Sequence, residues 1–319
     1  MKQVKKKVLE YLARGGQVVS GEDMAIQLDA TRAAVWKAVR ELRREGEDII
    51  STRKGYYLRQ KEEMRSSAFM MSVPEIGWVE CHETITSTND RAKEIALAGA
   101  PHLSVVFAEE QSQGRGRFSR TFYSQKGTGI YCSIVLRPTV SATYIQRITA
   151  LAAVAVSRAI ETLCPGEVGI KWVNDLWLGG KKICGILTEG AITPEGELAY
   201  AILGIGINVG HTDFPQEIQS IATDIESATG VKIPLFTLAK EVLLNLCHLL
   251  GGLETGAFLK EYASRSVLVG KEVTVSRGDE RISGVVRGIG ENGELCLLTG
   301  GEEIEISSGE VVTLHHMGG

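Results

Sequence analysis

Residues 109–120 form a loop whose residue types suit an anionic ligand. Between two apolar stretches lie two glycines and three arginines, at Gly114, Gly116, Arg115, Arg117 and Arg120. Glycine lets backbone amides approach a ligand closely, and a guanidinium group keeps its positive charge throughout the physiological pH range. The sequence therefore predicts a binding site for a polyphosphate or a carboxylate. A solvated loop in which Glu109 and Glu110 pair with the arginines is the alternative.

A second polar group precedes a tight glycine turn. Lys171, Asn174 and Asp175 lie in the sequence KWVND, and a Gly-Gly turn separates them from Lys182. If the two flanking strands pair in simple register, the hairpin brings Lys182 close to the other three residues. A lysine in a low-dielectric site can stabilise charge on a phosphoryl transition state. Ordinary surface charges on a hairpin are the alternative.

Common nucleotide-binding and metal-binding motifs do not explain this chemistry. The chain has no GxxxxGK[ST] sequence, which argues against a P-loop NTPase. Gly288, Gly290 and Gly293 match GxGxxG, but Asn292-Gly293 is typical of a hairpin turn and no helix follows, so we interpret the match as accidental. The histidines are dispersed, and the six cysteines form no CxxC pair, which predicts reduced thiols rather than a metal site.

The elements that position these motifs alternate apolar strands with amphipathic helices. The pattern predicts helices at residues 89–98, 143–163, 216–228 and 235–255. It predicts strands at residues 104–109, 129–137, 167–172, 175–178, 183–192 and 199–208. We expect an α+β core with a mixed sheet. From Val267 onward, short strands and turns predict a small β-barrel.

Residues 1–65 predict a winged helix-turn-helix. The first helix ends at Gly15-Gly16, the second follows the N-cap Ser20, and Thr31 can cap the third. Residues 49–52 and 56–58 then form a hairpin, the wing. We expect Arg43 to project outward with the residues of a DNA-contacting set at the third helix and the wing tip: Arg32, Ala33, Trp36, Lys37, Arg40, Arg53 and Lys54. A protein-interaction module with solvated basic residues is the alternative.

Charge is divided unevenly along the chain. The whole chain has a net charge of −4, but residues 1–65 carry +5 and the remainder −9. This asymmetry favours a polyanionic partner for the N-terminal module alone. Residues 60–75 are typical of a linker, and the predicted domains are 1–65, 66–266 and 267–319. The sequence has no signal peptide, and the apolar stretch at 148–157 is too short to span a bilayer, so we expect a cytoplasmic protein without a membrane partner.

Motifs in three segments together resemble the biotin protein ligases. In order along the chain they are STN, GRGR, KWxND, KxxGIL and GIGIN. With the N-terminal module, the whole chain resembles the bifunctional ligases that also repress the biotin operon. This resemblance implies a winged helix-turn-helix, a central mixed-sheet α/β ligase domain and a C-terminal SH3-like β-barrel.

The resemblance also implies a reaction in two steps. Biotin and MgATP give biotinyl-5′-AMP and pyrophosphate, and a lysine of a biotin carrier protein, a subunit of acetyl-CoA carboxylase, then takes the biotin. The loop is expected to be mobile without ligand and to close over the adenylate, which protects it from water. Biotinyl-5′-AMP is the implied corepressor: it promotes a homodimer that binds palindromic operator DNA.

The matched positions imply residue roles. Lys182 bridges the biotin carboxylate and the α-phosphate, and it forms the catalytic set with Arg117 and Asp175. Asp175 either carries or orients Mg²⁺ or helps deprotonate the incoming lysine, and the sequence leaves this open. The implied biotin-binding set is Ser87, Thr88, Asn89, Gln111, Arg115, Gly116, Arg117, Lys182, Gly204 and Gly206. The implied ATP-binding set is Arg115, Arg117, Arg120, Phe122, Lys171, Asn174, Lys182 and Asn208.

Three departures from the family pattern stand in these motifs. Ser119 replaces a glycine, so we expect loop closure to differ because serine restricts the backbone more. Phe122 replaces a tryptophan and can still stack on adenine, without an indole donor. Val173 replaces a proline, which we expect to be neutral.

Two other functions compete with the bifunctional one. A ligand-sensing repressor without catalysis is disfavoured because Lys182 and the GRGR motif are intact. A lipoate-type acyl ligase differs only in its acid, and GRGR with KWxND favours biotin.

Overall fold

The computed structural model describes residues 2–15, 18–44, 49–52, 54–58 and 67–315. The chain divides into two compact units, Met1–Pro74 and Glu75–Gly319. Each unit is described by itself.

The first unit contains the three predicted helices and the predicted wing. Its elements are α1 (Lys2–Gly15), α2 (Gly21–Gln27), α3 (Arg32–Arg44), β1 (Ile49–Thr52), β2 (Gly55–Leu58) and α4 (Ser67–Ser72). Both predicted caps are confirmed, because Ser20 Oγ accepts a hydrogen bond from Asp23 N and Thr31 Oγ1 accepts one from Ala34 N.

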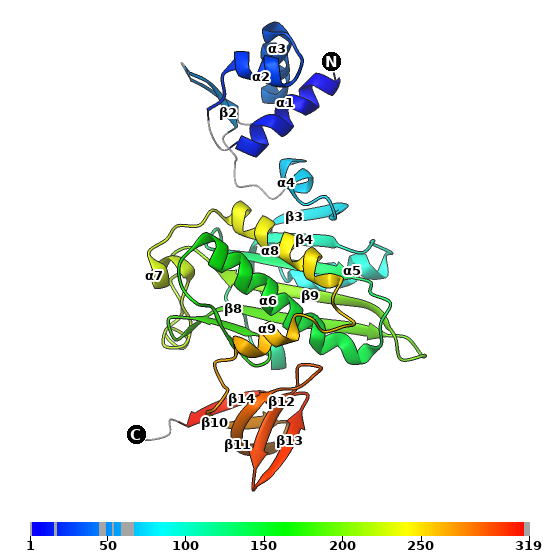
Figure 1. Cartoon of the computed structure of the whole chain (residues 1–319), viewed down its shortest axis with the longest axis vertical. Coiled ribbons are helices and arrows are strands. Elements are labelled where there is room, and N and C mark those ends of the chain that lie inside the picture. Colours follow the sequence, from blue (N-terminus) through cyan, green and yellow to red (C-terminus); the bar gives the residue numbers. More distant parts are fainter. Residues whose placement is uncertain (1, 16–17, 45–48, 53, 59–66, 316–319) are drawn as a thin grey trace. The chain divides into compact units, whose positions relative to one another are not determined.

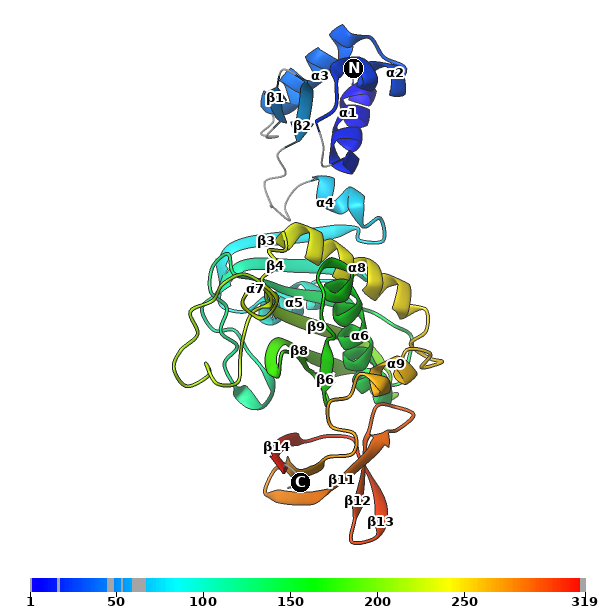
Figure 2. The ribbon, with the colours of Figure 1, turned by 60° about the vertical axis from the view of Figure 1, so that its left-hand side comes forward.

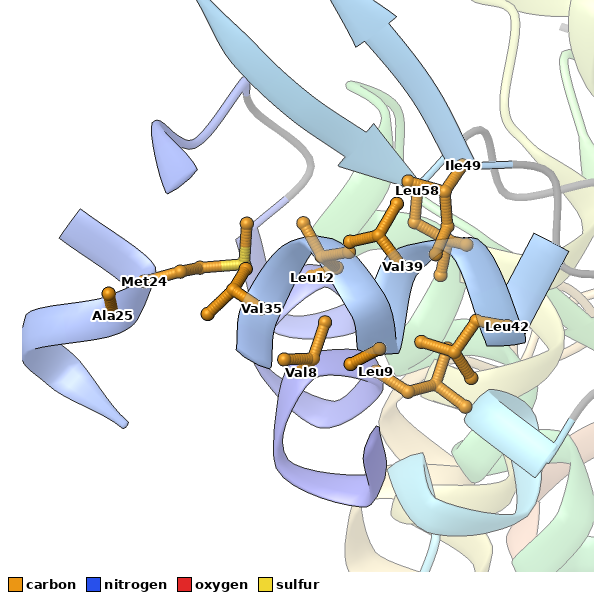
Figure 3. Close-up of a cluster of buried hydrophobic side chains, with 11 residues drawn as sticks. Val8, Leu9, Leu12, Met24, Ala25, Val35, Val39, Leu42, Ile49 and Leu58 are labelled. Carbon is orange, nitrogen blue, oxygen red and sulfur yellow. The ribbon is translucent and has the colours of Figure 1, made fainter. Parts of the chain in front are cut away.

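The core of this unit joins all three helices to the wing. Figure 3 shows side chains from α1, α2, α3 and the hairpin meeting in one buried cluster: Val8, Leu9, Leu12, Met24, Val35, Val39, Leu42, Ile49 and Leu58. These residues recur at three- and four-residue spacing along α1 and α3, so the apolar face of each helix is covered.

The expectation of a linker over residues 60–75 is wrong for its second half. Helix α4 occupies Ser67–Ser72, and Phe69 and Val73 are fully buried. The apolar run is too short to show helical periodicity in the sequence, so burial rather than local pattern identifies it. The first half of the expected linker lies outside the described residues.

A seven-stranded mixed sheet forms the centre of the second unit. Its order is β3-β4-β5-β9-β8-β7-β6, with β3 and β4 parallel and the remaining neighbours antiparallel. The strands are β3 (Trp78–Ile85), β4 (Ser104–Gln111), β5 (Gly129–Leu136), β6 (Gly169–Lys171), β7 (Asp175–Leu178), β8 (Lys181–Ile192) and β9 (Leu198–Asn208). The predicted strands are thus confirmed, and β3 is an additional strand that the sequence reading missed.

Helices cover both faces of this sheet. Helices α6 (Ile145–Leu163) and α8 (Leu235–Leu250) lie side by side on one face (Figures 1 and 2). Thr149 of α6 contacts Thr188, whose partner in β9 is Leu203. Helix α5 (Thr88–Leu97) packs on Val106, Val135 and Ile202, and side chains alternate along a strand, so α5 lies on the opposite face.

Most of the helix predicted at residues 216–228 is absent. Residues 216–221 form turns, Ala222 bridges to Lys182, and α7 spans only Ile225–Thr229. The helix begins where Asp224 accepts a hydrogen bond from Ser227 N at 2.7 Å. The short helix α9 (Leu259–Ser264) and the 3₁₀ turns η1 (Arg117–Ser119) and η2 (Ala142–Tyr144) were not predicted.

The C-terminal part is a five-stranded antiparallel sheet in the order β13-β12-β11-β10-β14. Its strands are β10 (Glu272–Arg277), β11 (Glu280–Ile289), β12 (Leu295–Thr299), β13 (Glu302–Ile306) and β14 (Glu310–His315). Over the described residues β13 and β14 do not pair, so the sheet stays open where a closed barrel was expected. Gly293 has φ +93° in the turn between β11 and β12, so the GxGxxG match lies on a hairpin as predicted.

One carbonyl group fastens this sheet to the central one. Gly293 O accepts hydrogen bonds from Gln146 Nε2 at 2.7 Å and from the buried indole of Trp172 at 2.9 Å.

Across the described parts of the chain, no helix combines the length and apolarity needed to cross a membrane.

Candidate active site

A cavity of about 320 Å³ lies between the central sheet, the loop after β4 and the residues before α7. Its walls contain every residue predicted to bind biotin or ATP, together with Asp175. These residues come from the start of α5, the end of β4, the arginine loop (residues 112–122), β6 to β8, and the second half of β9. The tertiary structure therefore brings the separate motifs into one site, and their individual roles stay predictions.

A buried polar network forms one end of the cavity. Thr88 N donates to Gln111 Oε1 at 2.8 Å, and Ser133 Oγ donates to Asn89 Oδ1 at 2.6 Å. Ser87 is the N-cap of α5, so capping and ligand contact can coexist at this position. Asn89 Nδ2 also donates to Glu189 Oε2 at 2.8 Å. Donors and acceptors held in fixed directions suit a ligand with a compact polar head.

At two positions of β9 only glycine fits, because other side chains lie very close to the backbone there. A Cβ atom at Gly204 would lie 2.1 Å from Asn89 Oδ1, and one at Gly206 would lie 2.5 Å from the ring of Phe122. Because both distances are far below van der Waals contact, any side chain here would displace the start of α5 or the aromatic ring. The bare backbone of β9 thus forms the floor of the cavity.

The arginine loop folds back on itself. Arg115 and Thr121 form an isolated bridge, and Gly116 N donates to Arg120 O at 2.7 Å. At the tip, Phe118 has φ +53° and Ser119 has φ +57°. The left-handed conformation favours glycine, which explains why the pattern that the chain resembles has a glycine at the position of Ser119.

The three loop arginines have different partners. Arg115 pairs with Asp90 and lies 3.8 Å from Glu189, and Arg120 lies 2.5 Å from Glu310 of β14. The alternative pairing with Glu109 and Glu110 is therefore wrong. Arg117 Nη1 donates to Asn174 Oδ1 at 3.3 Å. Burial lowers the pKa of Arg117, because removing the guanidinium from water disfavours its charged form.

Lys182 lies beside Asp175, with Nζ 2.6 Å from Oδ1. The expected simple register is wrong, because a bulge between Leu176 and Trp177 places Asp175 opposite Gly185. The extra residue rotates the local strand, yet the long lysine side chain still reaches the carboxylate. Burial lowers the pKa of Lys171, which lies 5.4 Å from the centre of the Trp177 ring.

Sequence reasoning missed the apolar wall of the cavity. Four apolar residues line it from the segment 209–224, which connects β9 to α7: Phe214, Ile218, Ile221 and Ala222. Lys182 N donates to Ile221 O, and Thr223 N donates to Lys182 O, both at 2.9 Å. Apolar residues carry no motif that separates a cavity wall from ordinary core, so no signal in the sequence identifies them. Glu310 and Val311 of β14 are likewise unpredicted lining residues.

The first unit presents a separate basic surface on α3. Arg32, Ala33, Trp36, Lys37 and Arg40 are exposed, and the guanidinium of Arg40 lies 4.7 Å from the Trp36 ring centre. Lys54 is exposed at the hairpin, and Arg53 lies outside the described residues. This arrangement supports the predicted DNA-contacting set.

Arg43 is exposed on the outer side of α3, as expected, but its guanidinium has partners in the wing. Arg43 Nε donates to Ile49 O at 2.5 Å, and Nη2 donates to Ser51 Oγ at 2.8 Å. Its guanidinium therefore ties α3 to β1. The sequence places Arg43 on the outer side of the helix, but only the position of the hairpin supplies its partners.

Comparison with known proteins gives three family matches along the chain. Residues 4–57 match the HTH domain, residues 81–208 the Biotin/lipoate A/B protein ligase family, and residues 268–313 the Biotin protein ligase C terminal domain. The chain is 37% identical over 249 residues to Bifunctional ligase/repressor BirA of Bacillus subtilis, covering 76% of each chain. It is 27% identical to the Escherichia coli protein of the same name, covering 91% of each.

A solved structure shares the fold of three quarters of the chain. The biotin protein ligase from Aquifex aeolicus, determined in complex with biotin and ATP, aligns with a TM-score of 0.64 and 28% identity. The alignment covers 75% of this chain and 99% of the Aquifex chain.

Proposed function

This chain belongs to the bifunctional biotin ligase/repressor family, and we propose that its cavity makes biotinyl-5′-AMP and passes the biotin to a lysine of a carrier protein. It is a biotin protein ligase that consumes ATP and also a transcriptional repressor. The observation that carries the assignment is the convergence of all predicted ligand-facing residues on one cavity that contains Lys182.

In the first step, a carboxylate oxygen of biotin attacks the α-phosphorus of ATP, and the bond to the bridging oxygen of pyrophosphate breaks. Lys182 and Arg117 place two cations where negative charge accumulates. In the second step, the carrier lysine attacks the acyl carbon, AMP leaves, and the amine loses a proton. Asp175 holds the Lys182 ammonium through both steps.

The polar end of the cavity favours biotin over lipoate. A ureido ring offers two N–H donors and one carbonyl acceptor, whereas a dithiolane ring offers neither. The network of Thr88, Asn89 and Gln111 contains both donors and acceptors. A ureido head can exchange hydrogen bonds with this network, whereas a dithiolane ring cannot, so biotin gains binding free energy that lipoate lacks.

Mg²⁺ enters this scheme as part of the substrate MgATP. Among the residues whose placement is described, no three His, Cys, Asp or Glu side chains gather into a metal site. Asp175 and Glu310 are the carboxylates in the cavity wall, and Glu310 is paired with Arg120. Mg²⁺ commonly uses one or two protein carboxylates together with substrate phosphates, so Asp175 is the residue that would contact it.

We further propose that the adenylate promotes homodimerisation, which places two α3 helices on palindromic operator DNA. The sequence prediction of domains 1–65, 66–266 and 267–319 is proposed with its first boundary moved to Pro74, where the first compact unit ends, and with an SH3-like character for the last domain. Support for the SH3-like proposal is the run of five short antiparallel strands.

A cytoplasmic location is supported by six free cysteines, since oxidising compartments favour disulfides.

The test is incubation with biotin, MgATP and a biotin carrier domain, with the mass of the acceptor as the readout. We expect a mass gain of one biotinyl group that requires ATP. A parallel reaction with lipoate and its acceptor domain should give no gain. A gain with lipoate alone would assign the chain to the lipoate branch of the matched family.

A further inference from the structure

Phe118 is placed at unusual cost for a residue that the proposed chemistry does not use. Its side chain is 58% exposed, and its φ is +53°. A bulky residue in the left-handed region loses stability, and an exposed aromatic side chain gains nothing from burial. Backbone strain and solvent exposure at one residue indicate a function that folding alone does not explain.

The geometry of the loop explains how Phe118 comes to lie at the mouth of the cavity, whose lining includes it. The bridge between Arg115 and Thr121 makes the loop a small hairpin, and Phe118 is at its tip. Arg117 is turned into the cavity, and its guanidinium lies 4.8 Å from the centre of the Phe118 ring. The arginine therefore supports one face of the aromatic ring, while much of the ring stays in contact with solvent.

Ile221 is a second exposed apolar residue at this cavity. It lines the cavity and is nevertheless 55% exposed. A side chain that both lines a cavity and contacts solvent lies at its mouth. Ile221 O accepts the hydrogen bond from Lys182 N, so this part of the mouth is attached directly to the residue at the reaction centre. Phe118 and Ile221 come from different segments, and we call them the apolar rim.

We propose that the apolar rim is a docking contact for the biotin carrier domain. The inference rests on the proposed ligase function. The side chain of the acceptor lysine extends only a few ångströms from the carrier backbone. The carrier surface must therefore contact the mouth of the cavity before the amine reaches the acyl carbon. Whatever covers that mouth during transfer covers Phe118 and Ile221 and removes their apolar surface from water.

The rim should act more strongly on the second step than on the first. The adenylate forms from two small molecules inside the cavity, whereas the carrier contacts the outer side of Phe118 and Ile221. Steady-state biotinylation at varied carrier concentration reports docking, and biotin-dependent exchange of pyrophosphate into ATP reports adenylate formation without a carrier. These two assays separate the rim from the binding site for biotin and ATP.

The test compares F118S and I221S with the wild type in the full chain. We expect each substitution to raise the KM for the carrier domain about tenfold and to slow pyrophosphate exchange by a clearly smaller factor, because both residues also line the cavity. F118Y keeps the aromatic surface and should retain the wild-type KM. L97S is the matched control, because Leu97 is 72% exposed on α5 and does not line the cavity.

Three results would overturn the rim as a carrier contact. A loss of pyrophosphate exchange equal to the loss of transfer would mean that Phe118 and Ile221 cover the small ligands. An unchanged KM for the carrier in both variants would show that neither residue contacts the carrier domain. Weaker self-association with unchanged carrier kinetics would assign the rim to a second copy of the chain. Failure of the wild type to biotinylate a carrier would instead contradict the ligase function.

Discussion

The ammonium of Lys182 lies 2.6 Å from Asp175 Oδ1 across the bulged hairpin of β7 and β8. The backbone of the same lysine is fixed by hydrogen bonds to Ile221 O and from Thr223 N. Main chain and side chain are thus held by different segments, which restricts where the positive charge can lie. A preorganised charge stabilises a transition state without reorganisation during the reaction.

Replacing Lys182 should impair chemistry more than binding. In K182A the cation between the biotin carboxylate and the α-phosphate is lost, so we expect adenylation to slow by about 10²- to 10³-fold. Biotin affinity should fall by less than about tenfold, because the polar network at Thr88 and Gln111 is untouched. Single-turnover pyrophosphate release and calorimetric biotin titration measure the two quantities. Equal losses in both would make Lys182 a simple contact.

The D175N substitution removes a charge without changing the side-chain volume. Lys182 then loses its counter-charge, and we expect adenylation to slow by about tenfold or more. The variant should be measured at increasing Mg²⁺ concentration and across pH. Recovery at high Mg²⁺ assigns Asp175 to the metal, whereas a changed pH dependence of transfer alone assigns it to deprotonation of the carrier lysine. A wild-type rate under all conditions contradicts every role proposed for it.

Ser119 offers a test of strain in the arginine loop. With φ +57° it occupies a conformation that favours glycine. We expect S119G to raise the free energy of unfolding by up to about 1 kcal/mol and S119V to lower it by at least as much. Thermal and urea unfolding of the two variants are the measurements. If S119V proves as stable as S119G, the loop conformation is not the source of strain.

Removing the first unit should separate the two functions. Because α4 belongs to this unit, the deletion should end at Pro74 rather than at the predicted boundary of residue 65. We expect the remaining chain to biotinylate the carrier and to lose operator binding. W36A in the full chain is the finer control and should weaken DNA binding while ligation persists. Operator binding by the truncated chain, measured by gel shift or fluorescence anisotropy, contradicts the winged-helix assignment.

Glu261 predicts an acid-sensitive contact between α6 and α9. Hydrogen bonds from Arg158 and then Arg265 lower the pKa of Glu261 in the folded protein below its ordinary value of 4.5. Its contribution to stability is therefore present above pH 4.5 and is lost as the pH falls through the lowered folded pKa. E261Q should be less stable than the wild type at pH 7, and the difference should shrink in acid. Urea unfolding at several pH values checks this, and a difference that stays constant with pH rules out the linkage.

Several features follow from the sequence because they depend on neighbouring residues. Ser20 and Thr31 can cap helices wherever the chain folds, and the Gly-Gly turn after β7 produces a hairpin locally. The motifs around Ser87, Arg115 and Lys182 likewise indicate the chemistry before any contact is known, since residue type and spacing already specify charge, hydrogen-bonding capacity and backbone freedom.

Other features exist only in the folded protein. The pairing of β3 with β4 and the apolar rim join segments that are far apart in the sequence. The bulge beside Lys182 and the contacts of Arg43 with the wing depend on how neighbouring elements pack, which local sequence patterns do not specify. Local patterns decide which segments become helices and strands, because capping and amphipathic periodicity act over a few residues. Packing decides which of these segments meet, and that choice placed an ion pair, a half-buried arginine and an exposed phenylalanine around one cavity.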